Sequence, residues 1–241
     1  SNVRLLADNV VISSATSWSA NTTLQLGTSS ASRVSVNADL TGSGATAGIV
    51  MMPAACTYSA TGTYTGCYSI DVKSGANITL SGATPSLSIG GTSYTVVNTV
   101  AGLTSFAGVS ANYSKPWALA APLDLSSSTF TNSLFGATYF SGTLDGLGNT
   151  VSNYTVTTNS SSNWEIGFFY VLSNATVRNF GLTTIKFLGN PTSGASYFAM
   201  GALGGYNIGT NTVDQVWSTG SIKTSASSVA VGVGGLLAWI P

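Results

Sequence analysis

The sequence predicts an all-β protein, a right-handed parallel β-helix (β-solenoid) of about ten coils with loops and a hairpin outside the coils. Two kinds of short strand segment alternate in the second half of the chain and recur at roughly 25–35 residues, a period typical of repeat architectures. Only 6% of the 241 residues are charged, and 28 are glycine. Because stacked coils place equivalent residues about 4.8 Å apart, repeated like charges would repel, whereas Ser, Thr and Asn form hydrogen-bonded ladders. A neutral, hydroxyl-rich surface is therefore expected.

The first hundred residues contain short β segments separated by small polar residues. Their spacing predicts coils of about 20 residues with two or three strands each. The expected strands are Val3–Leu6, Val10–Ile12, Thr23–Leu26, Val34–Val36, Gly48–Met51, Ile78–Leu80, Leu87–Ile89 and Tyr94–Val97. Asn and Asp side chains bond their own backbone in turns, so turns are expected at Asn9, Asn21, Asn37 and Asp39. Gly90-Gly91 predicts a two-residue turn between the last two strands.

The regular spacing breaks between residues 53 and 68, where we expect a hairpin or loop that projects from the coils. This segment holds both cysteines of the chain, Cys56 and Cys67. Two thiols without any His make a poor zinc site, so a disulfide is preferred over two free thiols. In the chain-entropy model it would stabilise the fold by about 3 kcal/mol. Tyr58, Tyr64 and Tyr68 are candidate contact residues, with the alternative that they lie across the coil wall.

Residues 101–241 form the second part of the chain, continuous with the first. A short helical turn is expected at Ala101–Val109, and Lys115-Pro116-Trp117 disfavours helix beyond it. The segment Phe140–Val151 is typical of a strand, a tight turn and a second strand. One recurring pattern places apolar residues second and fifth, in Thr150–Tyr154, Thr176–Phe180 and Thr212–Val216. The other is rich in Gly, in Ile166–Phe169, Met200–Gly205 and Val231–Leu236.

Two polar segments within these repeats are expected to be loops, Thr157–Trp164 and Gly189–Ser196. Loops inserted into a repeat leave the stacked core intact and often gather on one face. Trp164, Tyr197 and Phe198 lie at the edges of these loops, where exposed aromatic rings could stack on sugar rings, and Trp164 is a further candidate contact residue. Packing of its ring within the core is the alternative.

From about Tyr113 to the end, these segments resemble the GLUG-motif segments of large bacterial surface proteins, chiefly adhesins of the filamentous-haemagglutinin type. The segments that carry the resemblance are Ala118–Ala120, Leu123–Ser126, Phe140–Val151, Gly204-Gly205 and Gly234-Gly235. More loosely, Arg4–Val10 and Val34–Leu40 resemble the repeat region of filamentous haemagglutinins.

This resemblance implies a secreted or cell-surface segment of a large adhesin, exported through an outer-membrane transporter by a two-partner route. The segment would give a rigid rod and a contact surface for a receptor on a host or bacterial cell, with glycans included. It implies no cofactor. A stalk that binds nothing and carries a toxin or peptidase domain elsewhere is the alternative within this class.

An enzyme on the same scaffold is the alternative of a different class, because parallel β-helices include polysaccharide lyases and hydrolases. Glycoside cleavage requires two carboxylates at a defined separation. Asp145 and Glu165 are the only acids close in sequence in neighbouring coils, and turn chemistry next to Gly146 already accounts for Asp145. Without His the chain cannot form a Ser-His-Asp triad or a His-Glu-x-x-His zinc site. We therefore expect no catalytic residue and no metal site.

Charge and hydropathy argue against two further partners, nucleic acid and the interior of a membrane. Seven basic residues balance seven acidic ones, so no basic stripe is available for nucleic acid. The longest apolar run, Val229–Ile240, is interrupted by glycines and is about half the length that spans a bilayer. The start of the chain lacks the basic and apolar regions of a signal peptide, so either a signal peptide was removed or the chain is an internal fragment. The end at Pro241, within a repeated segment, favours the fragment.

Overall fold

A computed structural model describes residues 2–28, 33–52, 57–58, 64–65, 70–160, 164–191, 197–225 and 230–238. β-Strands make up 56% of it, and its helices are α1 (Val100–Ala107) and the short 3-10 turn η1 (Ser110–Asn112). The prediction of an all-β protein with parallel sheets is confirmed, as is the helical turn near residue 101. The chain divides into two compact units. The first comprises residues 1–98, 116–121 and 147–149, and the second the remaining residues.

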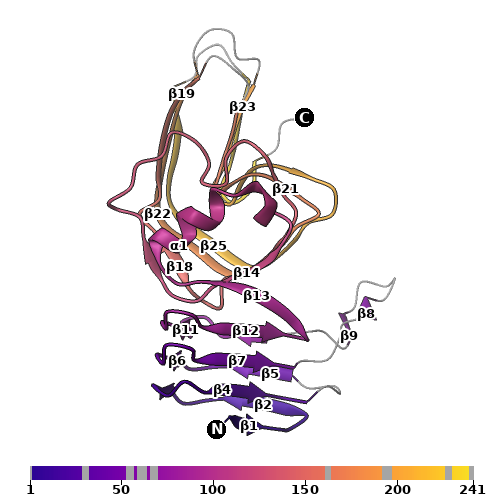
Figure 1. Cartoon of the computed structure of the whole chain (residues 1–241). Coiled ribbons are helices and arrows are strands. Elements are labelled where there is room, and N and C mark those ends of the chain that lie inside the picture. The colour runs from indigo at the N-terminus through magenta and orange to yellow at the C-terminus, as the bar shows by residue number, and fades with distance from the viewer. Residues whose placement is uncertain are drawn as a thin grey trace. The chain divides into compact units, whose positions relative to one another are not determined.

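The strands of the first unit return to the same sheets in a fixed order. They are β1 (Val3–Leu5), β2 (Asn9–Ile12), β3 (Thr16–Trp18), β4 (Thr23–Leu26), β5 (Arg33–Val36), β6 (Leu40–Gly42), β7 (Gly48–Met51), β10 (Ile70–Val72), β11 (Ile78–Leu80) and β12 (Ser86–Ile89). Parallel pairing joins β1, β4, β7 and β12 in one sheet, β2, β5 and β10 in a second, and β3, β6 and β11 in a third. Figure 1 shows these strands as successive layers at the indigo end of the chain.

Register places like side chains in columns through this unit. Val10, Val34 and Ile70 are paired residues of β2, β5 and β10, and all three are buried. The strands alternate buried and exposed residues, as in the pattern exposed, buried, exposed, buried along β2. Full burial of a Val, Leu or Ile side chain contributes about 1.5–3 kcal/mol, so each column stabilises the in-register pairing. The Leu24–Ile49–Leu87 pairs form an equivalent column in the first sheet.

The predicted strands of this unit agree with the structure to within two residues at each end. Sequence analysis missed β3, β6 and β10, which have three residues each and include polar or small residues that weaken a strand signal. Gly90 and Gly91 have φ of 57° and 81° and join β12 to the antiparallel strand β13 (Thr92–Val97), so the predicted turn is confirmed. Asn9, expected in a turn, is instead the first residue of β2.

Side-chain amides tie neighbouring layers of the first unit together. Asn149 is buried, and its Nδ2 donates to the carbonyl oxygens of Ile78 (2.8 Å) and Leu119 (2.9 Å). Leu119 ends β14 (Pro116–Leu119), which pairs with β13. Asn21 and Asp39, expected in turns, accept hydrogen bonds from the backbone amides of Thr46 and Asn77. These side-chain hydrogen bonds satisfy backbone groups that the strands leave unpaired.

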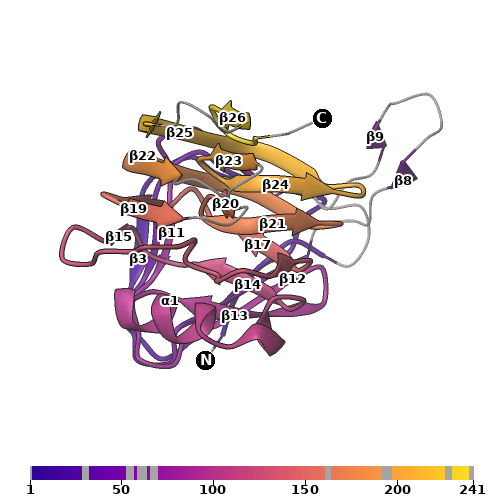
Figure 2. The same ribbon diagram turned by 90° about the horizontal axis from the view of Figure 1, so that it is seen from above.

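Two long strands organise the second unit, β22 (Thr176–Pro191) and β25 (Thr212–Thr224), which pair in parallel. Along β22 lie three shorter strands in succession, β17 (Thr143–Asp145), β18 (Thr150–Ser152) and β19 (Thr155–Ser160). Strand β15 (Leu123–Asp124) pairs with β18. Two further parallel sheets are β16 (Tyr139–Phe140), β21 (Phe169–Ser173) and β24 (Gly204–Ile208), and β20 (Trp164–Ile166), β23 (Tyr197–Gly201) and β26 (Ala230–Gly234). Figure 2 shows β20, β23 and β26 in this order.

The structure corrects two expectations for this unit. Thr150 pairs with Gly181, whereas Thr143 pairs with Thr176, so the pattern at Thr150–Tyr154 is not equivalent to the one at Thr176–Phe180. Thr176 does pair with Thr212, as the pattern predicts. The expected loops are also shorter than predicted, because β19 continues to Ser160 and β22 to Pro191.

The long strands bend at residues with positive φ. Asn179 and Gln215 both have φ of 51°, and they interrupt the pairing of β22 with β25 at the same place. Arg178 pairs with Asp214 before this point, and Phe180 pairs with Val216 after it. A non-Gly residue rarely adopts positive φ, and Asn does so more readily than most. These residues therefore fix where the strands turn.

Aromatic side chains fill the core of the second unit. Phe135 is fully buried, and its ring meets those of Phe106, Tyr113, Phe140, Phe168 and Phe169 at centroid distances of 4.7–6.4 Å. Phe106 comes from α1, whose N-cap Thr99 accepts a hydrogen bond from the Gly102 amide. Edge-to-face and tilted pairs of this kind add about 0.5–1.5 kcal/mol each to the burial of the rings.

Candidate functional site

Most of the candidate residues between 53 and 68 lie outside the part of the chain that the structure describes. Cys56, Cys67 and Tyr68 lie outside the described residues, and so do the side chains of Tyr58 and Tyr64. The backbone of β8 (Thr57–Tyr58) pairs antiparallel with that of β9 (Tyr64–Thr65), and Tyr58 and Tyr64 are partners in the backbone register. The disulfide and the contact role of these tyrosines stay predictions.

Asp145, the first acid of the suspected catalytic pair, has a complete set of partners. It is fully buried, and its Oδ2 accepts a hydrogen bond from Arg178 Nε at 2.7 Å. Its Oδ1 accepts from Asn179 Nδ2 at 3.1 Å. Arg178 is the residue paired with Asp145 in the parallel register of β17 and β22. The turn explanation for Asp145 is therefore wrong, because it is the strand residue of an ion pair with the next strand.

Glu165, the second acid, lies at the middle of β20 with only 6% of its surface exposed. Its Oε1 accepts a hydrogen bond of 2.5 Å from the Tyr197 hydroxyl, and its buried Oε2 has no hydrogen-bond partner among the described residues. The main chain at this point is held by Ser133, whose Oγ donates to the Glu165 carbonyl and accepts from the Gly167 amide. No described contact joins Glu165 to Asp145, and each carboxylate has its own surroundings.

Two tyrosines, Tyr197 and Tyr170, lie against this carboxylate, and Tyr139, Tyr206 and Trp164 lie beside those two; we name these residues, together with Glu165, the Glu165 cluster. The hydroxyl of Tyr197 is bound to the carboxylate, and Tyr139 and Tyr206 lie close enough to raise the pKa of Tyr197 further. Trp164 is half-buried and meets the ring of Tyr170 edge to face, with centroids 6.5 Å apart. Thus Trp164 contacts another aromatic ring rather than standing alone at a loop edge.

Strand register explains how these side chains meet. Glu165 pairs with Ala199, and Tyr197 lies two residues before Ala199 on the same face of β23. Tyr139 and Tyr206 both pair with Val171, one from each side, and Val171 is only 2% exposed. These partners lie 26 to 41 positions from Glu165 in the sequence, so only knowledge of the register would have revealed the cluster.

The Glu165 cluster lies where β24 closely approaches β20. A Cβ atom added to Gly205 of β24 would be 2.4 Å from the Ile166 nitrogen and 2.8 Å from Glu165 Cβ. The residues beside Glu165 in the next two strands are small, Ala199 and Gly232. The glycine therefore permits the close approach of the two sheets, and side chains from both converge on one carboxylate.

The phenols around Glu165 resist ionisation. The hydrogen bond to the Glu165 carboxylate, together with burial and the charge of that carboxylate, raises the pKa of Tyr197 to about 12. Burial, and then the same carboxylate, raises the pKa of Tyr170. Burial alone raises the pKa of Tyr154, whose ring is in the core. At neutral pH the tyrosines are thus neutral donors around a carboxylate.

We expect the free energy of unfolding to fall as the pH rises above 10, the ordinary pKa of a tyrosine. The folded pKa values are raised, so this stabilisation is complete below the unfolded pKa and is lost as the pH rises toward the folded value of about 12 for Tyr197. Urea unfolding at pH 9, 10, 11 and 12 measures it. Tyr154→Phe should flatten the decline, and an unchanged slope would contradict the assignment.

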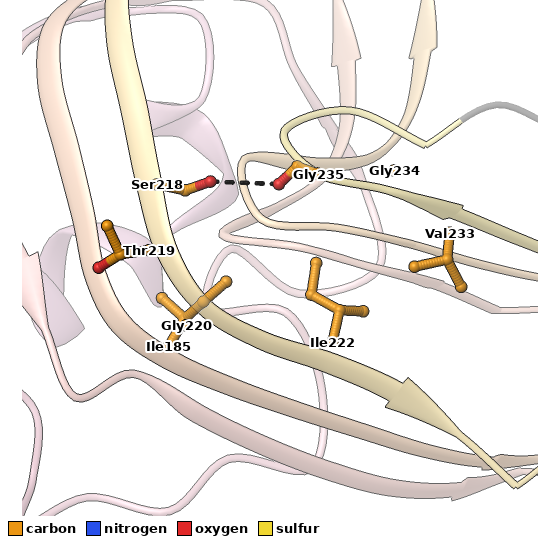
Figure 3. A pocket seen from close by; sticks show the side chains of 8 residues that line it. All are labelled: Ile185, Ser218, Thr219, Gly220, Ile222, Val233, Gly234 and Gly235. Carbon is orange, nitrogen blue, oxygen red and sulfur yellow. Dashed lines mark hydrogen bonds between the residues drawn. The ribbon is translucent and has the colours of Figure 1, made fainter.

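A pocket of about 310 Å³ lies between β22, β25 and β26 (Figure 3). Its lining is made of apolar, Gly, Ser and Thr residues: Ile185, Ser218, Thr219, Gly220, Ile222, Val233, Gly234 and Gly235. Ser218 Oγ donates to the Gly235 carbonyl across it at 3.2 Å. With no charged group in its lining, this pocket offers less chemistry than the Glu165 cluster.

The described residues also bear on membrane crossing and on metal binding. None of their helices has the length and apolarity needed to cross a membrane. In the same part of the chain, no group of three or more His, Cys, Asp or Glu side chains lies together as a metal site requires.

Comparisons with known proteins found no match to a protein-family model, to a curated protein or to a solved structure. The function is therefore inferred from the strand pattern and from the geometry around Glu165.

Proposed function

We propose that the chain is a segment of a right-handed parallel β-helix and serves as a non-enzymatic part of a bacterial surface adhesin of the filamentous-haemagglutinin type. The observation that supports this proposal is the fixed order in which strands of the first unit return to three parallel sheets, with apolar columns inside. Main-chain ladders of this kind give length and rigidity without a cofactor. Side chains on the outer faces are then available for contacts.

The ion pair of Asp145 supports a contact function over an enzymatic one. Both oxygens of this carboxylate are occupied by Arg178 and Asn179, so it is not available as an acid, base or nucleophile. Glycoside cleavage by the pair Asp145 and Glu165 would need both carboxylates at one sugar ring. The Glu165 cluster instead combines one carboxylate with aromatic side chains, a composition suited to binding.

The proposal places the segment outside the cell, exported through an outer-membrane transporter, with a receptor on a host or bacterial surface as its partner. The near-zero net charge and the many Ser, Thr and Asn residues are compatible with such a surface. Nucleic acid is not a proposed partner, because seven basic residues are balanced by seven acidic ones.

Binding of the fluorescently labelled 241-residue segment to host cells and to a glycan array tests this function. Saturable binding is expected, and the same preparation should release no sugar from a panel of polysaccharides. Binding to nothing would favour the alternative of an inert stalk. Polysaccharide turnover that is lost in Glu165→Gln would overturn the proposal in favour of an enzyme.

A further inference from the structure

The Glu165 side chain is buried, and no cationic side chain of the described residues forms an ion pair with it. The ion pairs found among the described residues are Arg33–Asp71 and Arg178–Asp145, and Glu165 belongs to neither. Burying a carboxylate in a medium of low dielectric constant is costly unless it is paired and hydrogen-bonded. The Tyr197 hydroxyl satisfies Oε1. The Tyr170 hydroxyl also lies against this carboxylate, but Oε2 is buried and accepts no hydrogen bond of ordinary geometry in the described part of the chain. An external cation would complete this site.

The side chains around the carboxylate favour an organic cation over a metal ion. A metal ion needs several oxygen, nitrogen or sulfur ligands, and one carboxylate does not supply them. An aromatic ring carries partial negative charge on its face and attracts an ammonium group within about 6 Å of its centre. Tyr139, Tyr170, Tyr197, Tyr206 and Trp164 provide such rings in the Glu165 cluster.

We propose that the Glu165 cluster binds an alkylammonium group, with the carboxylate as its counter-charge and the tyrosine rings as its walls. This inference rests on the proposed contact function and names the chemistry that the contact surface recognises. The group has two natural sources, the side chain of a lysine in a partner protein and the choline headgroup of a lipid or glycoconjugate. Both place a positive charge on an apolar stem, which suits rings of this kind.

Exposure indicates the side from which the ligand enters. Tyr139 is 58% exposed and Tyr206 is half-buried, and both flank the buried Val171 in register. Because Glu165 Oε2 is covered, an entering ammonium group must move a phenol aside. Tyr139 is the most exposed side chain of the cluster, so it is the phenol that we expect to turn. Ala199 and Gly232, the small residues beside Glu165 in the following strands, limit the crowding on that side.

Isothermal titration of the full 241-residue chain with choline and with 3,3-dimethyl-1-butanol, its uncharged analogue of the same shape, tests the role of charge. Choline is expected to bind about tenfold more tightly than the alcohol, with sodium chloride at the same concentration as the ionic-strength control. Titration with n-butylammonium, which mimics a lysine side chain, separates the two sources. Equal binding of choline and the alcohol, or no binding of either cation at millimolar concentration, would overturn the proposal.

Two substitutions locate the site. Glu165→Gln, which keeps the shape and removes the charge, should weaken choline binding about tenfold. The matched control Asp8→Asn removes the charge of an exposed acid in the first unit and should leave it unchanged. Should Glu165→Gln lower the thermal midpoint, Tyr206→Ala gives a second test, with a loss of severalfold. Unchanged affinity in both Glu165→Gln and Tyr206→Ala would contradict the assignment.

The outcome is distinguishable from that of the proposed function. If the chain binds cells or glycans but neither cation, the contact function stands and the ammonium site is wrong. If choline binds at Glu165 and the chain binds no cell, the site stands and the adhesin proposal fails. If choline competes with cell binding, the ammonium site is part of the surface that contacts the cell.

Discussion

Arg178→Ala is expected to lower the free energy of unfolding by about 3–5 kcal/mol, because it leaves the fully buried Asp145 carboxylate without its cation. The Arg178 side chain is 19% exposed, so the pair is shielded from water on most sides. The Asn179 hydrogen bond to Oδ1 remains in this variant but does not supply a charge. Urea unfolding at pH 7, with the change taken from the midpoint at constant m value, measures the loss.

The exposed ion pair of Arg33 and Asp71 provides the control for this variant. Its side chains are 61% and 36% exposed, and Arg33→Ala should cost at most about 1 kcal/mol. Replacing both buried partners at once, in Asp145→Leu with Arg178→Met, should restore much of the stability, because no uncompensated charge is left. Equal effects of Arg178→Ala and Arg33→Ala would show that Asp145 is not buried as described.

Phe135→Ala should cost about 3–5 kcal/mol, the range for deleting a fully buried phenylalanine ring. The ring contacts five other aromatic rings and has no exposed surface, so its removal leaves a cavity at the centre of the second unit. Denaturant unfolding of the purified variant measures the effect.

Tyr139→Ala is the matched surface control for Phe135→Ala. Its side chain is 58% exposed, and most surface substitutions change stability by no more than about 0.5 kcal/mol. A Phe135→Ala variant as stable as Tyr139→Ala would contradict the aromatic core. A fall in the m value of Phe135→Ala would indicate instead that unfolding of the variant is not two-state.

Alternating apolar residues made most of the fold predictable in the first unit. The strands around Val10, Val34 and Ile49 carry strong β-branched or aliphatic alternation, and they were located correctly. Strands such as Thr16–Trp18 were missed because their polar or small residues weaken the apolar alternation by which a strand is recognised. The in-register columns then follow from burial of one face, since a slip by one residue would expose every apolar side chain.

In the second unit, repeat patterns in the sequence were a less reliable guide to which strand segments pair. The pattern at Thr150–Tyr154 resembles that at Thr176–Phe180, but β22 is long enough to hold several partners, and Thr150 pairs further along it with Gly181. Similarity between short sequence segments does not show which part of one long strand each neighbouring strand pairs with. The register of β22 with β25 shifts between Leu182 and Ile185, next to Thr184 with its positive φ of 54°, and such a shift leaves little trace in the sequence.

The sequence pointed to Glu165, Trp164 and Tyr197 separately but did not show that they lie together. Their aromatic neighbours come from β16, β21, β23 and β24, and only the pairing of these strands brings the phenols to one carboxylate. Asp145 was assigned to a turn because its cation, Arg178, lies 33 positions further along the chain. The resemblance to haemagglutinin-type adhesins and the Cys56–Cys67 disulfide stay predictions.

The central claim is that successive strands stack in parallel and in register, and spin labels at Val11 and Ser35 test it most directly. These residues are paired on the outer side of β2 and β5, and parallel neighbours lie about 4.8 Å apart. In a background of Cys56→Ser and Cys67→Ser, the doubly labelled protein should give a strongly broadened electron spin resonance spectrum. A spectrum equal to the sum of the two singly labelled proteins, in a fully folded sample, would contradict the stacking.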